Sequence, residues 1–180
     1  MATDLMLDIE TLGWHTDTVV CTLGAVKFNP YTLEEPHSGI YFRLDIDEQL
    51  NLGRSTDADT LEWWGKQPQE IREEALSEFN RQSIAQGLAD LNKILVGVRN
   101  IWCQGPHFDI TILESLYRQS GRPVPWNFWQ IRDSRTLFSL KGDPRSEMRL
   151  DAHNALADCY FQAIAVQKVF KKLGIRYEDS

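Results

Sequence analysis

The sequence predicts an α/β domain in which a mixed sheet packs against helices on both faces. Three segments in the first 46 residues have the composition of strands, and only short polar turns separate them. After residue 55 the apolar spacing changes to three and four, the period of a helix, and helical segments then alternate with short apolar strands. Three antiparallel strands followed by helix–strand alternation are typical of such a mixed sheet.

The amino-terminal strands are expected over residues 4–9, 18–28 and 39–46. The first is a short apolar run, the second is rich in β-branched residues, and the third alternates apolar and polar side chains. The turns between them are too short to hold a crossover helix, so the three strands should form an antiparallel meander.

The remainder of the chain should alternate helices and strands. One helix is expected to start at residues 55–57 and another at Pro68. Further helices are expected over residues 83–97, 108–119 and 153–172, and short strands over residues 100–104 and 131–134. The sequence contains no repeat, low-complexity tract or long linker, and 180 residues is an ordinary length for one domain. We therefore expect residues 1–180 to form a single domain.

Composition argues against several classes of protein. A net charge of −7 disfavours a protein that covers duplex nucleic acid with a basic face, although bound divalent cations can reverse the field within one site. The cysteines Cys21, Cys103 and Cys159 are odd in number and far apart, which favours buried, reduced thiols over a disulfide framework or a zinc site. With no signal-peptide pattern and no apolar run of about 18 residues, we expect a cytoplasmic protein without a membrane partner.

Acidic residues occur at three separated places that could meet in the fold. Asp8 and Glu10 lie two residues apart in the first strand, so their side chains project from the same face. Asp109 lies at the start of a helix, where a capping role is more common. Asp158 lies in the first turns of the last helix, with His153 at its entry. Each residue alone is compatible with an ordinary solvated or capping position.

Considered together, these residues point to a metal site. The ends of neighbouring strands in an α/β sheet converge on one crevice, and four carboxylates there would repel one another unless cations intervened. Oxygen ligands without thiols suit Mg²⁺ or Mn²⁺. Two such ions about 3.5–4 Å apart support in-line displacement at phosphorus, and a histidine supplies a base with a pKa near neutrality.

The acidic motifs, in this order, resemble those of the DEDDh 3′–5′ exonucleases, a family with an RNase H-like fold that includes RNase T. The motifs are Asp8-Ile9-Glu10-Thr11, Phe108-Asp109 and His153-x-Ala155-x-x-Asp158. A narrower resemblance, to exodeoxyribonuclease VIII-like and phage exonucleases and the related Rv2179c-like exoribonucleases, covers most of the chain. It is carried by residues 6–13, 23–26, 60–67, 125–129, 132–137 and 153–158. One departure is Trp102-Cys103-Gln104-Gly105, where the family is expected to have Trp-Gly-Asn-Gly.

The resemblance implies a metal-dependent 3′–5′ exonuclease that hydrolyses single-stranded nucleic acid from its 3′-hydroxyl end and releases nucleoside 5′-monophosphates. It favours DNA as the substrate. An exoribonuclease or short-oligonucleotide hydrolase is the main alternative, and a non-catalytic metal-binding interaction module is a more remote one. The partner would be the 3′ end of single-stranded DNA or RNA. Whether the protein also forms a homodimer is left open.

The resemblance also assigns roles to individual residues. Two Mg²⁺ ions, which Mn²⁺ could replace, would be held by Asp8, Glu10, Asp109 and Asp158. The attacking water would be activated by His153, and the terminal nucleotide would be contacted by Thr11, Leu12 and Phe108.

Several residues near these motifs have more than one interpretation. Trp63 and Trp64 could stack on bases, but one of them should lie in the core. Arg132, Asp133 and Arg135 are expected to form an ion pair within the protein near the site, although an arginine there could instead meet a phosphate.

Overall fold

A mixed sheet organises the part of the chain that the computed structural model describes, residues 3–148 and 154–177. Within that part six strands lie in the order β4-β3-β2-β1-β5-β6. They are β1 (Asp4–Thr11), β2 (Val20–Phe28), β3 (His37–Leu44), β4 (Arg81–Gln82), β5 (Ile101–Cys103) and β6 (Ile131–Asp133). β1, β2 and β3 form an antiparallel meander, whereas β5 runs parallel to both β1 and β6. The predicted mixed sheet is confirmed.

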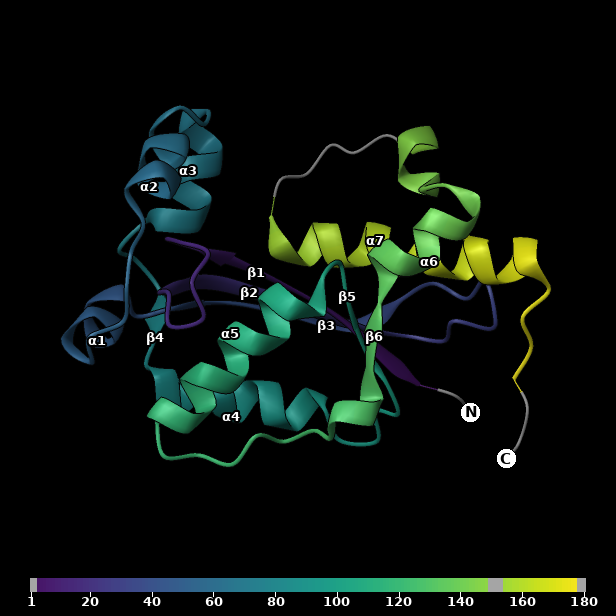
Figure 1. Ribbon diagram of the computed structural model, residues 1–180, viewed down its shortest axis with the longest axis horizontal. Helices are drawn as coiled ribbons and strands as arrows, with labels where there is room; N and C mark the ends of the chain where they lie inside the picture. The colour runs from purple at the N-terminus through teal and green to yellow at the C-terminus, as the bar shows by residue number, and fades with distance from the viewer. Residues whose placement is uncertain (1–2, 149–153, 178–180) are drawn as a thin grey trace.

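Helices cover both faces of this sheet, as predicted. Figure 1 shows α4 and α5 against one face, α6 and α7 against the other, and α2 and α3 beside one end of the sheet. The helices are α1 (Ile46–Asn51), α2 (Ala58–Gly65), α3 (Gln69–Leu76), α4 (Ile84–Ile94), α5 (Pro106–Gln119), α6 (Ser134–Lys141) and α7 (Ala155–Leu173). There are also two 3₁₀ turns among the described residues. Phe128–Gln130 precedes β6, and Pro144–Glu147 follows α6.

Side-chain alternation along β1 divides the core into two layers. Leu7 and Ile9 are buried in a cluster with residues of α4 and α5. Met6 is buried in a second cluster, with residues of α6 and α7. Because alternate residues of a strand face opposite sides, Asp8 and Glu10 face the α7 layer.

The third strand and the element after it differ from the prediction. The strand ends at Leu44 instead of residue 46, because the Asp45 side chain caps a helix by accepting a hydrogen bond from the Glu48 amide at 2.9 Å. That helix, α1, was not expected from the sequence. It is held by the buried Gln49, whose side-chain amide bonds both the N–H and the carbonyl of Val20 at 2.8 Å.

Two further expectations concern thiols and membranes. The three cysteines are buried and free, as predicted. Among the described residues, no helix combines the length and the apolar character that crossing a membrane requires.

Candidate active site

Three carboxylates meet where β1 passes beneath the amino-terminal end of α7. Asp8, Glu10 and Asp158 each offer one oxygen, and these oxygens all lie within 4.8 Å of one another. Asp8 and Glu10 share the α7 face of β1, and Asp158 lies in the first turn of α7. This spacing would let one hard cation take an oxygen from each side chain.

Gly24 on β2 allows α7 to approach the sheet this closely. It pairs with Asp8 across the β1–β2 ladder. A Cβ atom at this position would lie 2.4 Å from the backbone of Ala155 and Leu156, so any side chain here would push α7 away. The Cys159 thiol donates to the Gly24 carbonyl at 3.2 Å and fixes the same contact. The missing side chain at residue 24 therefore sets how near Asp158 comes to Asp8.

Asp109 approaches the cluster from the other layer. The pairing of β5 with β1 stops at Met6 and Trp102, so the Ile9 amide lies beyond the parallel ladder. This amide donates to Asp109 Oδ1 at 3.3 Å. The helix cap is Gly105, with a φ of +108°, and Asp109 is buried in the first turn behind it. Asp109 is therefore not a capping residue; it lies beside the three clustered carboxylates.

Burial and mutual repulsion raise the pKa values of these carboxyl groups. The pKa of Asp8 is well above its usual value, first because of burial and then because of the charges of Asp109, Glu10 and Asp158. Burial and then Asp158 raise the pKa of Glu10 to about 7. Burial also raises the pKa of Asp109 to about 7, against the effect of its backbone hydrogen bonds. A divalent cation would relieve this repulsion, and four carboxylates are the donor set that hard cations prefer.

We expect the melting temperature of the metal-free protein to rise as the pH is lowered from about 8 to about 6. The pKa values of Glu10 and Asp109 are about 7 in the fold, above the usual 4.5 and 3.8. The folded state therefore binds more protons than the unfolded state between these values, and that stabilisation is lost as the pH rises through 7. Thermal unfolding in a chelator at both pH values measures the effect. Saturating Mg²⁺ should flatten the dependence, and a flat metal-free profile would contradict the prediction.

A cavity of about 210 Å³ opens beside Glu10 and Asp158. Its far wall comes from α2, α3 and the turn between them, and includes Trp63, Trp64 and Gln67. The volume is several times the roughly 30 Å³ that one water molecule occupies. The cavity can therefore hold a group larger than a structural water next to the carboxylates.

The two tryptophans of α2 have different environments. Trp64 is buried, and its Nε1 donates to the Thr11 carbonyl at 2.9 Å, which ties α2 to the end of β1. Trp63 is 50% exposed and meets Trp64 edge to face at 4.9 Å. The expectation that one tryptophan lies in the core is confirmed, and both rings form part of the cavity wall.

Thr22 forms part of the cavity wall, and no feature of the sequence singles it out. It pairs with Glu10 across the β1–β2 ladder and is buried. Its hydroxyl has no hydrogen-bond partner among the described residues. Because buried hydroxyl groups are normally paired, this one is an exception that the surrounding packing leaves without a partner.

The residues expected to contact a terminal nucleotide do not line this cavity. The Thr11 side chain is buried and donates to the Gly13 carbonyl at 2.6 Å. Leu12 packs in an apolar cluster that includes Trp64, and Phe108 packs, partly buried, against the larger core cluster. Contact of these three residues with a nucleotide stays a prediction.

Two other expectations concern His153 and the residues around β6. His153 lies outside the described residues.

Asp133 caps α6 by accepting from the Arg135 amide at 3.0 Å, while the Arg135 guanidinium donates to the Gln104 carbonyl at 3.1 Å. The Arg132 guanidinium bonds backbone carbonyls. The expected ion pair is therefore wrong for these described residues. Backbone carbonyls accept from both arginines, and the Asp133 carboxylate accepts from backbone amides and, at 2.6 Å, from the Thr136 hydroxyl.

The sheet order and its two helical layers define an RNase H-like fold, which this chain shares with several solved exonucleases. A family model described as the 3′-5′ exoribonuclease Rv2179c-like domain matches residues 3–170. The chain belongs to this family and is a nuclease of the hydrolase class.

Solved structures with the same fold are exonucleases of low sequence identity. E. coli exonuclease I in complex with a 5cy-dA13 oligonucleotide has 19% identity and a TM-score of 0.64, over 96% of this chain and 41% of that one. The nuclease domain of 3′hExo, a DEDDh family member bound to rAMP, has 15% identity and a TM-score of 0.61, over 99% and 96%. Exonuclease X in complex with 5′ overhanging duplex DNA has 13% identity and a TM-score of 0.60, over 94% and 92%. The chain thus spans about two fifths of exonuclease I, and no curated protein matched it.

Proposed function

We propose that this nuclease removes nucleoside 5′-monophosphates from the 3′-hydroxyl end of single-stranded nucleic acid with the help of two divalent cations. The observation that carries the proposal is the meeting of Asp8, Glu10 and Asp158 within 4.8 Å, with Asp109 beside them. The proposal treats residues 1–180 as one catalytic domain of a cytoplasmic enzyme.

The chemistry is divided between the carboxylates and the histidine. Asp8, Glu10, Asp109 and Asp158 would hold Mg²⁺ or Mn²⁺, and such ions neutralise phosphate charge and acidify a bound water. The Ile9 amide holds one oxygen of Asp109, which fixes the orientation of that carboxylate. His153 would accept the proton of the attacking water.

The cavity beside Glu10 would receive the terminal nucleotide. The exposed ring of Trp63 offers a stacking surface for the base. The Gln67 amide offers a polar contact at the same wall. The buried Trp64 closes the inner side, so the pocket suits a chain end better than a continuous strand.

The proposal also concerns the sugar of the substrate, which is deoxyribose in DNA and ribose in RNA. Resemblance to exodeoxyribonucleases favours DNA, whereas the matched family is described as an exoribonuclease domain. Solved relatives hold both kinds of ligand, a dA13 oligonucleotide and rAMP. We therefore propose activity on single strands of either kind, with the preferred sugar decided by direct comparison.

Digestion of end-labelled single strands tests this function. We expect 5′-labelled DNA or RNA to shorten stepwise from a 3′-hydroxyl in Mg²⁺, to stall at a 3′-phosphate and to persist in EDTA. The net charge of −7 leaves few phosphate contacts, so affinity should fall only shallowly with salt, by about −0.7 in log–log slope per phosphate contacted. Asp8→Asn protein purified in parallel controls for contaminating nucleases. Efficient cutting of a circular single strand would identify an endonuclease and overturn the proposal.

A further inference from the structure

Gln162 is a polar side chain of α7 that lies inside the protein, next to the carboxylate cluster. It is 3% exposed, and its side-chain amide donates a hydrogen bond to the Asp8 carboxylate. Its amide oxygen, Oε1, is also buried and has no hydrogen-bond partner among the described residues. A buried amide oxygen without a partner destabilises a fold. Packing alone would therefore favour an apolar side chain at this position.

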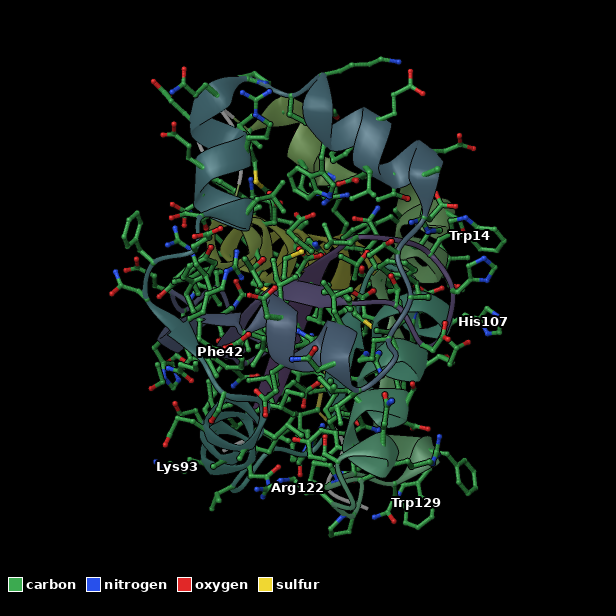
Figure 2. All side chains as sticks on the ribbon, turned by 90° about the vertical axis from the view of Figure 1, so that its left-hand side faces the viewer. Trp14, Phe42, Lys93, His107, Arg122 and Trp129 are labelled. Atoms are coloured by element: carbon green, nitrogen blue, oxygen red, sulfur yellow. The ribbon has the colours of Figure 1, made fainter. Side chains whose placement is uncertain are left out.

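The spacing of residues along α7 matches the spacing along β1. Figure 1 and Figure 2, two views at right angles, both show α7 packed against β1. Four residues of a helix rise about 6 Å, which is close to the roughly 6.6 Å between alternate residues of a strand. Asp158 and Gln162 are four residues apart and share one face of α7. When Asp158 faces Glu10, Gln162 therefore comes level with Asp8.

A second carboxylate of β1, Asp4, shows what a purely structural environment looks like. Asp4 accepts from the Trp102 indole at 2.8 Å, and the Arg99 guanidinium lies 3.8 Å from its other oxygen. Asp8, in contrast, lies among other carboxylates and is bonded by the neutral amide of Gln162. A neutral donor can orient a carboxylate without cancelling its charge. The charge of Asp8 thus stays available to a cation.

We propose that Gln162 is a positioning residue, which holds the Asp8 carboxylate in the orientation that binds a divalent cation and thereby sets the affinity of the site for that cation. The inference rests on the proposed function and deepens it, because it assigns a role to a residue outside the four carboxylates and the histidine. Carboxylates that bind metals are themselves commonly hydrogen-bonded. Loss of such an outer partner typically lowers metal affinity or activity about 10- to 100-fold.

Gln162→Met tests this role, because methionine is similar in size but has no N–H donor. The dissociation constant for Mn²⁺, measured from the electron paramagnetic resonance signal of the free ion, should rise about 10- to 100-fold. The rise in melting temperature at one fixed Mn²⁺ concentration should become smaller accordingly. For cleavage of a single-stranded oligonucleotide, the Mg²⁺ concentration that gives half the maximal rate should also rise. Saturating Mg²⁺ should restore most of kcat, because the ligands themselves are unchanged.

Gln167→Met is the matched control on the same helix. Gln167 is 2% exposed, but its side-chain amide donates to the carbonyls of Asn29 at 3.0 Å and Glu34 at 2.8 Å, between β2 and β3. Loss of these hydrogen bonds should lower the melting temperature in EDTA, because two carbonyls lose their donor. The dissociation constant for Mn²⁺ should keep its wild-type value.

The Mn²⁺ dissociation constants decide the proposal. A Gln162→Met protein that binds Mn²⁺ as tightly as the wild type would overturn it, as would an equal loss of affinity in Gln167→Met. Should Gln162→Met fold poorly, Gln162→Asn withdraws the N–H from Asp8 by one methylene group and should weaken Mn²⁺ binding in the same way.

The same measurements separate this inference from the proposed function. A wild-type protein that binds Mn²⁺ but cleaves neither DNA nor RNA would reject the proposed function, and the dissociation constants would still decide the role of Gln162. A wild-type protein that binds no Mn²⁺ would reject both.

Discussion

Asp8→Asn should lower nuclease activity by about 10³-fold or more while making the metal-free protein more stable. A lost metal ligand removes several kcal/mol of transition-state stabilisation, at about 1.4 kcal/mol for each tenfold in rate. The same change removes a buried charge that Glu10, Asp109 and Asp158 all repel, so the apo fold should gain stability. Opposite signs for activity and stability are expected of a metal ligand but not of a residue that merely supports the fold.

Turnover and thermal unfolding, each with Mg²⁺ and with EDTA, measure the two effects. Metal should raise the melting temperature of the wild type by linkage and raise it much less in Asp8→Asn. Glu10→Gln, Asp109→Asn and Asp158→Asn should behave alike. Asp109→Asn is the most conservative of these, because the amide oxygen of asparagine can still accept from the Ile9 amide.

Asp4→Asn provides a control on the same strand. Asp4 is buried at the other end of β1, where its carboxylate accepts from the Trp102 indole at 2.8 Å. This substitution should change neither the rise in melting temperature that Mg²⁺ causes nor the metal dependence of activity. Undiminished activity of the wild type in excess EDTA would refute the metal site altogether.

The carboxylates could be predicted because their placement follows from local rules. Strand alternation alone puts Asp8 and Glu10 on one face. The order of strand, turn and final helix then brings Asp109 and Asp158 to the same end of the sheet. None of this depends on how closely the layers approach one another.

The depth and the walls of the site depend on how closely the helical layers approach the sheet, and they could not be predicted. Gly24 lies in a strand pattern that gives no sign that a helix backbone rests on it. Trp63 and Trp64 are neighbours on one helix, so periodicity predicts that one is buried but not that the other lines a cavity. The unpaired state of the Thr22 hydroxyl follows from packing around it and has no sequence signal.

Side-chain capping explains the errors in the sequence-based prediction. Asp45 continues the alternation of the third strand, but its carboxylate bonds the Glu48 amide and starts α1 instead. Asp133 has arginines on both sides, which favours an ion pair on composition. The backbone amides of Gly105 and Arg135 bond one oxygen of its carboxylate, and the Thr136 hydroxyl bonds the other. In both cases a backbone amide two or three residues further along the chain takes the carboxylate that the sequence assigns to another role.

His153→Ala should lower turnover by about 10²–10⁴-fold, the usual cost of losing a general base. Asn154, which follows it in the chain, caps α7 and lines the cavity together with Glu10 and Asp158. We therefore expect the histidine to act on the attacking water without binding the ions. Mn²⁺ or Mg²⁺ should consequently raise the melting temperature of His153→Ala as much as that of the wild type.

The pH profile at saturating metal identifies the base. Bound cations keep the neighbouring carboxylates ionised, so the rising limb of kcat near the ordinary histidine pKa of about 6.5 would belong to His153. This limb should be absent in His153→Ala, and added imidazole should restore part of the rate as the free base accumulates. His37→Ala, which removes an exposed histidine on β3, should keep the wild-type profile. If His153→Ala instead lost the metal-induced stabilisation, the histidine would be a ligand, and the proton of the attacking water would have to pass to another group.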